Sequence, residues 1–305
     1  MKPEWALIAN LQAGHKTSLK KWEKVQALLS AAGIEYVPFY TNHVGHAREQ
    51  AIAVLEKGYR YIAVMGGDGT ISEVVDGVMK SGVDTTQVVI GLLPFGTGND
   101  WARYWKIKKV SDAVRCLANM NTSWVDVGKV QFDNPQPTLR YFINAIGFGF
   151  DARVIQITNR VQRWFKGQAW TYSLSLFMAV LKHHSQYMQF EADSWKESFK
   201  CYTVSVGNGA YTGGGIRQTP LATPFDGKLD VMAMGSLSFV TIVKAIGLLF
   251  RGKLLAHPSV RFQRVEQLCV SSNEVIVSEV DGILQPLTHR FTISIVPRAL
   301  RFVCP

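Results

Sequence analysis

Short apolar runs alternate with longer segments of helical periodicity through residues 5–93, and this alternation restricts the fold more than any other feature. The apolar runs cover residues 5–9, 34–40, 61–65 and 88–93. The first two helical segments end at Gly33 and Gly58, and glycine suits the left-handed residue that closes a helix. Strands and helices that alternate in this way form a mostly parallel sheet with helices on both faces.

The pattern changes near Trp124, after which strands dominate. The expected strands cover residues 125–130, 141–145, 201–206, 229–234, 268–270, 275–280 and 291–296. Glycine-rich turns separate many of them, as is typical of an antiparallel sandwich or barrel. Two predicted helices, at residues 170–183 and 239–251, interrupt this part of the chain. We therefore expect a second, β-rich domain that begins near residues 125–130.

Two glycine-rich loops follow apolar strands and lead into helices. Residues 66–70 read Gly-Gly-Asp-Gly-Thr, and residues 94–100 read Pro-Phe-Gly-Thr-Gly-Asn-Asp. Glycines let the backbone approach a bound group closely, and free N–H groups at a helix start favour an anion. A tight turn would explain one such loop, but both leave carboxyl ends of strands, where ligands bind. Asp68 would repel a bare phosphate, which indicates a magnesium ion or an attacking hydroxyl between them.

The net charge of +10 favours an anionic partner, although solubility alone could also account for it. The basic residues are scattered and form no dense run, which argues against nucleic acid. Two amphipathic stretches, from Trp164 to Phe177 and from Ile242 to Lys253, carry apolar side chains beside Arg and Lys. Such stretches dock on an anionic membrane interface or pack as ordinary core-facing helices.

The cysteines and the N-terminus bear on the cellular compartment. The four cysteines have no paired spacing, which indicates free thiols in a reducing compartment. The first ten residues carry no cleavage-site pattern, and no apolar run reaches the ~18 residues of a membrane span. We expect a cytoplasmic protein that associates peripherally with the inner face of the membrane.

The motifs, taken in order, resemble those of the bacterial diacylglycerol-kinase-like lipid kinases. This family is similar to sphingosine and ceramide kinases and, more distantly, to NAD kinases and phosphofructokinases. Besides the two glycine loops, the resemblance rests on Trp124-Val125-Asp126-Val127-Gly128, Gly147-Phe148-Gly149-Phe150-Asp151, Gly207-Asn208 with Gly213-Gly214-Gly215, and Asp226-Gly227-Lys228-Leu229-Asp230. The set spans nearly the whole chain, which makes it more specific than any single motif.

The resemblance implies two domains and a nucleotide site. An α/β domain of the NAD-kinase and phosphofructokinase type would cover residues 1–127, and a β-rich sandwich domain that carries the lipid would cover residues 128–290. Residues 291–305 would pack back on the first domain. ATP and Mg²⁺ would be the cofactors. The ATP contacts would be Asn10, Gly14, Thr41, Gly66, Gly67, Asp68, Gly69, Thr70, Glu73, Gly96 and Thr97. The acidic groups around the phosphates and the magnesium would be Asp68, Asp100 and Asp126.

The resemblance also implies a structural magnesium in the β-rich domain. Its ligands would be the side chain of Asp226 and the backbone carbonyls of Thr223 and Lys228. Asp226-Gly227 is in addition a strong signal for a hairpin turn, and a turn is compatible with a metal site.

The last family motif usually reads Asp-Gly-Glu, with an acid near the acceptor hydroxyl that acts as general base. This sequence reads Asp281-Gly282-Ile283. Asp281 would then act alone, or Glu279 would replace the missing acid, because residues two apart on a strand share a face. We expect Glu279 to be an ordinary exposed strand residue. Lost or altered catalysis is the third alternative.

The expected reaction is transfer of the γ-phosphoryl group of ATP to a hydroxyl of a membrane lipid, diacylglycerol or a related glycerolipid. One alternative is a kinase of a soluble substrate, similar to NAD kinase. Another is a non-catalytic protein that binds nucleotide and lipid, which Ile283 suggests. A Rossmann dehydrogenase is disfavoured because the chain lacks an early Gly-x-Gly-x-x-Gly motif. The expected partners are the lipid substrate and an anionic membrane surface; a homodimer is left open.

Overall fold

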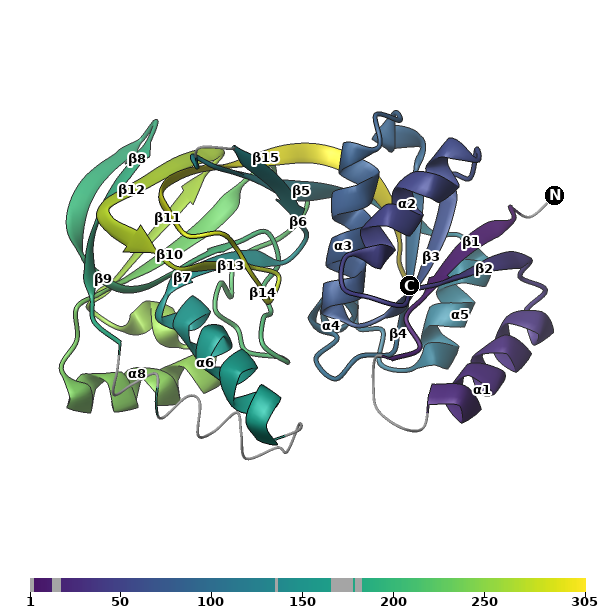
Figure 1. The fold of residues 1–305 in the computed structure, drawn as a ribbon, viewed down its shortest axis with the longest axis horizontal. Coiled ribbons are helices and arrows are strands. Elements are labelled where there is room, and N and C mark those ends of the chain that lie inside the picture. The colour runs from purple at the N-terminus through teal and green to yellow at the C-terminus, as the bar shows by residue number, and fades with distance from the viewer. Residues whose placement is uncertain (1–2, 13–17, 135–136, 166–177, 179–182) are drawn as a thin grey trace.

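A computed structural model describes the chain over residues 3–12, 18–134, 137–165, 178 and 183–305. Its strands join in one continuous mixed sheet of 15 strands. The N-terminal part of the sheet is parallel and carries helices, and the C-terminal part is antiparallel; the two lie next to each other along the long axis (Figure 1). This arrangement confirms the predicted α/β domain followed by a β-rich, sandwich-like domain. Within the described residues, no helix is long and apolar enough to cross a membrane.

Four parallel strands form the N-terminal part of the sheet. They are β1 (Trp5–Ala9), β2 (Tyr36–Tyr40), β3 (Tyr61–Gly66) and β4 (Val89–Pro94). The helices are α1 (Ser18–Ala31), α2 (His46–Glu56), α3 (Asp68–Lys80), α4 (Asp100–Tyr104) and α5 (Val110–Asn119), with a short 3-10 helix, η1 (Thr85–Gln87). The strand order β4-β3-β1-β2 brings the carboxyl ends of all four strands to one edge.

The remaining strands surround a second apolar core. They are β5 (Thr122–Phe132), β6 (Thr138–Phe142), β7 (Ala145–Gly149), β8 (Gln186–Ala192), β9 (Trp195–Gly207), β10 (Leu229–Gly235), β11 (Val260–Val265), β12 (Gln267–Ile276), β13 (Ser278–Val280), β14 (Ile283–Leu284) and β15 (Thr288–Val303). A third core lies under α6 (Phe150–Phe165), α8 (Phe239–Phe250) and the 3-10 helix η2 (Leu254–Ala256).

Two long strands belong to both parts of the sheet. Strand β15 pairs with β12 in its first half, and near its end Arg301 and Phe302 pair in parallel with Val89 and Ile90 of β4. Strand β5 runs antiparallel to β15 from Thr122 to Phe132. The boundary predicted between residues 127 and 128 thus lies inside β5, and the C-terminal segment completes the N-terminal sheet.

A buried ion-pair cluster makes a further link between the two parts. Asp76 of α3 is fully buried and accepts hydrogen bonds from Arg140 (3.0 Å) and from the backbone N–H of Tyr141 (2.9 Å), both in β6. Arg48 of α2 lies 2.6 Å from the same carboxylate, and Lys80 lies 3.0 Å from it. One carboxylate therefore holds three cations, of which Arg140 is itself buried.

Asp76→Asn should lower the free energy of unfolding by about 3–5 kcal/mol, because it leaves the guanidinium of Arg140 buried without a counter-charge. Urea unfolding measures this loss. Asp112→Asn is the matched control, since its partner Arg115 is exposed and such a surface pair contributes ~1 kcal/mol or less. Equal losses for the two variants would contradict the assignment of Asp76 as a linking residue.

A candidate active site between the two halves

A cleft of about 550 Å³ lies between the parallel and antiparallel parts of the sheet. The two glycine loops line it on one side, and β7, α6, the loop around Gly213 and the turn after β13 line it on the other. Five carboxylates reach this cleft: Asp68, Asp100, Asp151, Glu279 and Asp281. Like charges at such density disfavour the ionised forms, so a cation or a shared proton is needed to offset them.

The two glycine loops touch each other through their backbones. A Cβ atom on Gly96 would lie 2.5 Å from the Cα of Gly67, so neither loop could carry a side chain at this contact. The N–H of Phe95 also donates to the carbonyl of Gly66 (2.8 Å). The starts of α3 and α4 are thereby held next to each other, and the free N–H groups of helix starts attract anions.

Asp68 and Asp100 stand at these helix starts. Asp68 Oδ1 accepts the N–H of Trp101 (3.1 Å), and Asp100 Oδ2 accepts the N–H of Gly214 (2.8 Å) from the opposite wall. Burial raises the pKa of Asp68 to about 6, and the negative charge of Asp100 adds to the rise. Burial also raises the pKa of Asp100. Its Oδ1 is buried without a hydrogen-bond partner and lies 3.8 Å from Nε of Arg103.

The other residues expected to contact ATP lie along the carboxyl edge of the parallel strands. Asn10 follows β1 and donates to the hydroxyl of Thr70 (3.2 Å), and Thr41 follows β2. Thr97 lines the cleft itself. Glu73 takes a different place: its carboxylate accepts the N–H groups of Gly45 (2.8 Å) and Ala47 (3.2 Å) at the start of α2. Gly14 lies outside the described residues.

Asp126, expected near the phosphates, lies away from the residues that line the cleft. Its buried carboxylate accepts the N–H groups of Gly227 (2.8 Å) and Arg298 (2.7 Å). It therefore joins β5 to the turn at residues 226–227 and to the irregular part of β15. These bonds give Asp126 a structural role in this structure.

At the predicted structural metal site, the side chain of Asp226 has partners within the chain. The carboxylate of Asp226 accepts the N–H of Lys228 (3.0 Å) and contacts the guanidinium of Arg264. Arg264 also bonds Asp230 (3.0 Å), and the hydroxyl of Thr223 accepts from Tyr104 (3.2 Å). The Asp226 carboxylate thus already has a cation of the chain as its partner, whereas the expected ligands on Thr223 and Lys228 are backbone carbonyls.

Asp281 holds one wall of the cleft in place through hydrogen bonds to backbone N–H groups. Its carboxylate accepts the N–H groups of Ile143, Asn144 and Ala145, each at 3.0 Å, and the residue itself adopts a left-handed backbone with φ of 48°. A carboxylate offers about four lone-pair positions, so these three fixed donors use most of them. Burial raises its pKa, and the hydrogen bonds from Ile143 and Ala145 oppose that rise.

Glu279 is buried in the cleft wall, which shows that the expectation of an ordinary exposed residue was wrong. Its side chain is 6% exposed, and Oε2 accepts the N–H of Gly282 (2.6 Å). Burial raises its pKa to about 8, and the nearby charges of Asp151 and Asp281 add to the rise. A Cβ atom on Gly147, the cross-strand neighbour, would lie 2.6 Å from Oε1, so a glycine is needed there.

Asp151 was quoted in the sequence motif but not assigned a role in the site. It lies in the first turn of α6, where Oδ2 accepts from Ser205 (2.8 Å) and Gln218 (2.9 Å). Burial raises its pKa to about 6. An acid that follows Gly147-Phe148-Gly149-Phe150 directly, at the end of an apolar strand, was the signal that could have identified it.

An apolar pocket of about 40 Å³ adjoins the cleft beneath α8. Phe150, Asp151, Gln218 and Leu249 line both spaces. The pocket's other walls are almost all apolar and come from β9, β10, α8 and the segments that follow β10 and α8; they include Tyr202, Met232, Met234, Leu237, Ile242, Ala245 and Leu254. A polar, acidic space therefore continues into an apolar one.

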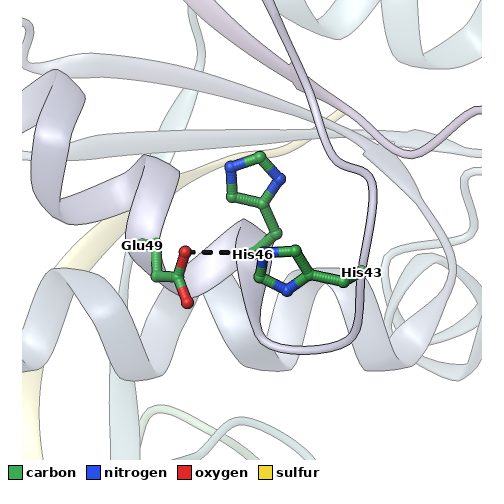
Figure 2. Close-up of side chains that lie close together, drawn as sticks. All are labelled: His43, His46 and Glu49. Atoms are coloured by element: carbon green, nitrogen blue, oxygen red, sulfur yellow. Dashed lines mark ion pairs between the residues drawn. The ribbon is translucent and has the colours of Figure 1, made fainter.

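His43, His46 and Glu49 form a separate cluster at the start of α2, which Figure 2 shows in close-up. Nε2 of His43 lies 3.8 Å from Glu49, and the two imidazoles stack at 4.6 Å. The Nδ1 atom of His46 accepts the N–H of Asn42, and its Nε2 lies 3.0 Å from the side-chain amide nitrogen of Gln50. Neither nitrogen of His46 is free for a metal, and we assign none.

Comparison with known proteins gives two family matches. Residues 4–130 match the diacylglycerol kinase catalytic domain, and residues 144–304 match the YegS C-terminal NAD kinase beta sandwich-like domain. A diacylglycerol kinase of Mycobacterium tuberculosis is 27% identical over 98% of this chain and 94% of its own length. A protein of Pseudomonas aeruginosa named probable lipid kinase YegS-like is 28% identical over 93% of this chain and 90% of its own length.

A solved structure has the same fold. The crystal structure of a diacylglycerol kinase from Bacillus anthracis superposes with a TM-score of 0.73 at 19% identity. The match covers 100% of this chain and 97% of that one. Both the parallel and the antiparallel part are therefore present in that protein.

Glu279→Gln should stabilise the fold increasingly as the pH rises from 5 to 8. The unfolded wild type releases this proton near pH 4.5 and the folded one keeps it to about pH 8, so the wild type loses stability across that interval. The difference between the two proteins should grow by on the order of 4 kcal/mol and then level off. Urea unfolding at several pH values measures it.

Glu274→Gln, an exposed acid of β12, should follow the wild type at every pH. An amide that packs less well at position 279 would add an offset that does not vary with pH. A constant difference between wild type and Glu279→Gln would therefore contradict the raised pKa.

Proposed function

Because the chain belongs to the family of lipid kinases that carry the diacylglycerol kinase catalytic domain, we propose that it phosphorylates a glycerolipid hydroxyl with ATP and Mg²⁺. Diacylglycerol is the leading substrate. The observation that carries the proposal is the shape of the site: an acidic cleft between two glycine loops continues into an apolar pocket. A charged phosphate donor suits the first space, and the apolar second space, at about 40 Å³, can hold only a short piece of an acyl chain.

The residues of the glycine loops fit a magnesium-bound nucleotide. The start of α3, which follows Gly66 and Gly67, supplies N–H groups for phosphate oxygens. Asp68 and Asp100 would hold the ion, which Asp100 Oδ1, buried and without a partner, supports. When bound, the ion offsets charge on the transferred phosphoryl group. The two glycine loops would orient the γ-phosphate toward the wall formed by β7, α6 and the turn after β13, where the acceptor hydroxyl would lie.

The apolar pocket favours a lipid over a soluble substrate such as NAD. Met232, Met234 and Ile242 give this pocket an apolar wall, which suits hydrocarbon better than a polar nucleotide acceptor. The direct test is a phosphate-transfer assay with radiolabelled ATP against a panel of lipids, with the product identified by mass spectrometry. Transfer to NAD and to no lipid would overturn the proposal.

Asp68→Asn should abolish phosphoryl transfer and leave the fold intact. The amide keeps an oxygen that can accept the N–H of Trp101, but it loses the charge that a magnesium–nucleotide complex requires. The measurements are the transfer rate and urea unfolding. Asp133→Asn, at an exposed ion pair with Arg290, is the control and should retain the wild-type rate. Near-normal turnover by folded Asp68→Asn would remove this residue from the mechanism.

We further propose that the protein docks on anionic membranes through the end of α8. Arg251 and Lys253 are exposed there, and Arg217 packs against Gly252, beside Leu249 of the cleft wall. This cluster would place the mouth of the cleft at the lipid surface. The other stretch expected to contact a membrane, Trp164 to Phe177, lies outside the described residues apart from the end of α6.

The double change Arg251→Glu and Lys253→Glu should weaken binding to anionic vesicles. Each basic group near such a surface contributes ~1 kcal/mol, so the loss is at least on the order of 2 kcal/mol, roughly 30-fold. Vesicle sedimentation measures it, and ~1 M salt, with a Debye length of roughly 3 Å, should release the wild type. The control is Lys108→Glu with Lys109→Glu, on the other half of the molecule; equal losses in both doubles would contradict a specific docking face.

A further inference from the structure

The carboxylate of Glu279 lies in the cleft wall, in a space that its neighbour Gly147 leaves open. It lies in β13, where its cross-strand neighbours are Gly147 of β7 and Leu284 of β14. The glycine leaves space for the carboxylate, since a Cβ there would come within 2.6 Å of Oε1. Glu279 also lines the cleft together with Asp151, which is the second residue of α6, the helix that directly follows β7.

The hydrogen bonds of the two acids in this turn differ in number. The carboxylate of Asp281 is held by three backbone N–H groups, which leaves about one lone-pair position for any other donor. The carboxylate of Glu279 accepts two such bonds, from Gly282 (2.6 Å) and from Gly147. Glu279 therefore retains more capacity to accept a proton from a hydroxyl in the cleft, and Asp281 serves to hold the turn from Ile143 to Ala145.

The register of the last hairpin explains why position 283 does not supply this acid. Glu279 pairs with Leu284, and Val280 pairs with Ile283. Directly paired residues of an antiparallel ladder point to the same face, and successive residues point to opposite faces. Ile283 thus lies on the face opposite to Glu279. The structure describes both residues, and of the two only Glu279 lines the cleft.

We propose that Glu279 accepts the proton of the lipid hydroxyl during phosphoryl transfer. This inference rests on the proposed function. As the hydroxyl oxygen bonds to the γ-phosphorus, the bond from that phosphorus to the bridging oxygen breaks, and its electron pair leaves on ADP. The hydroxyl proton passes to the carboxylate of Glu279, which later returns it to solvent.

The groups that face Glu279 make it a stronger base than a free carboxylate. The negative charges of Asp151 on α6 and Asp281 in the following turn both raise its pKa, in addition to burial. Strands β7 and β14, the other elements packed against it, consist of apolar residues and glycine and present no charge. A base with a pKa near the working pH combines a usable ionised fraction with a strong pull on the proton.

The test is the pH profile of kcat/KM for the lipid at saturating ATP. In the wild type it should rise about tenfold per pH unit and level off near pH 8. Glu279→Gln should lower kcat by ~10²–10⁴-fold and remove this rising limb, with the KM for ATP little changed. Glu279→Asp should keep the limb at a reduced rate, which a purely structural role would not produce. Glu274→Gln is the control and should keep the wild-type profile.

The outcomes separate this inference from the proposed function. A wild type that phosphorylates a lipid, with Glu279→Gln within about threefold of its rate or with the same rising limb, overturns the role of Glu279 alone. A folded wild type that phosphorylates no lipid overturns both. Urea unfolding of each variant at the assay pH shows whether a lost rate reflects a lost fold.

Discussion

The walls of the cleft are held in place by carboxylates that bind backbone N–H groups. Asp281 holds the turn from Ile143 to Ala145, and Asp100 reaches across the cleft to Gly214. Asp126 joins the turn at Gly227 to the irregular part of β15. Hydrogen bonds to charged acceptors are shorter and roughly twice as strong as neutral ones, and here they fix segments that regular strand pairing leaves unpaired.

This use of acids divides the carboxylates of the cleft into two groups. Asp281 accepts three backbone N–H groups and shapes the cleft. Asp68 and Glu279 each accept fewer fixed bonds and stand on opposite walls, with pKa values raised to about 6 and about 8 by burial. Two acids that differ in this way can serve different purposes within one reaction, one near the phosphates and one near the acceptor.

Much of the fold could be predicted because its signals are local. Apolar strands and glycine-terminated helices identified the parallel sheet, and the two glycine loops identified the edge of it that lines the cleft. The places of Asp126 and Glu279 could not be predicted in the same way. Each depends on contacts between segments far apart in sequence, such as Asp126 with Arg298 and Glu279 with Gly147. Sequence spacing places a residue on a strand face, but only the tertiary register decides what that face meets.

The pairing of the last strand with β4 has a consequence for how the molecule is made. The ribosome releases residues in order, and N-terminal domains generally fold first. Here the parallel sheet that carries the glycine loops lacks its outer neighbour until Arg301 and Phe302 have been synthesised. Until then β4 is an open sheet edge, which can pair with another chain. The nascent N-terminal half should therefore need protection from aggregation until this partner strand has been made. Removal of Arg301 and Phe302 should likewise expose the edge of β4 and destabilise the N-terminal half.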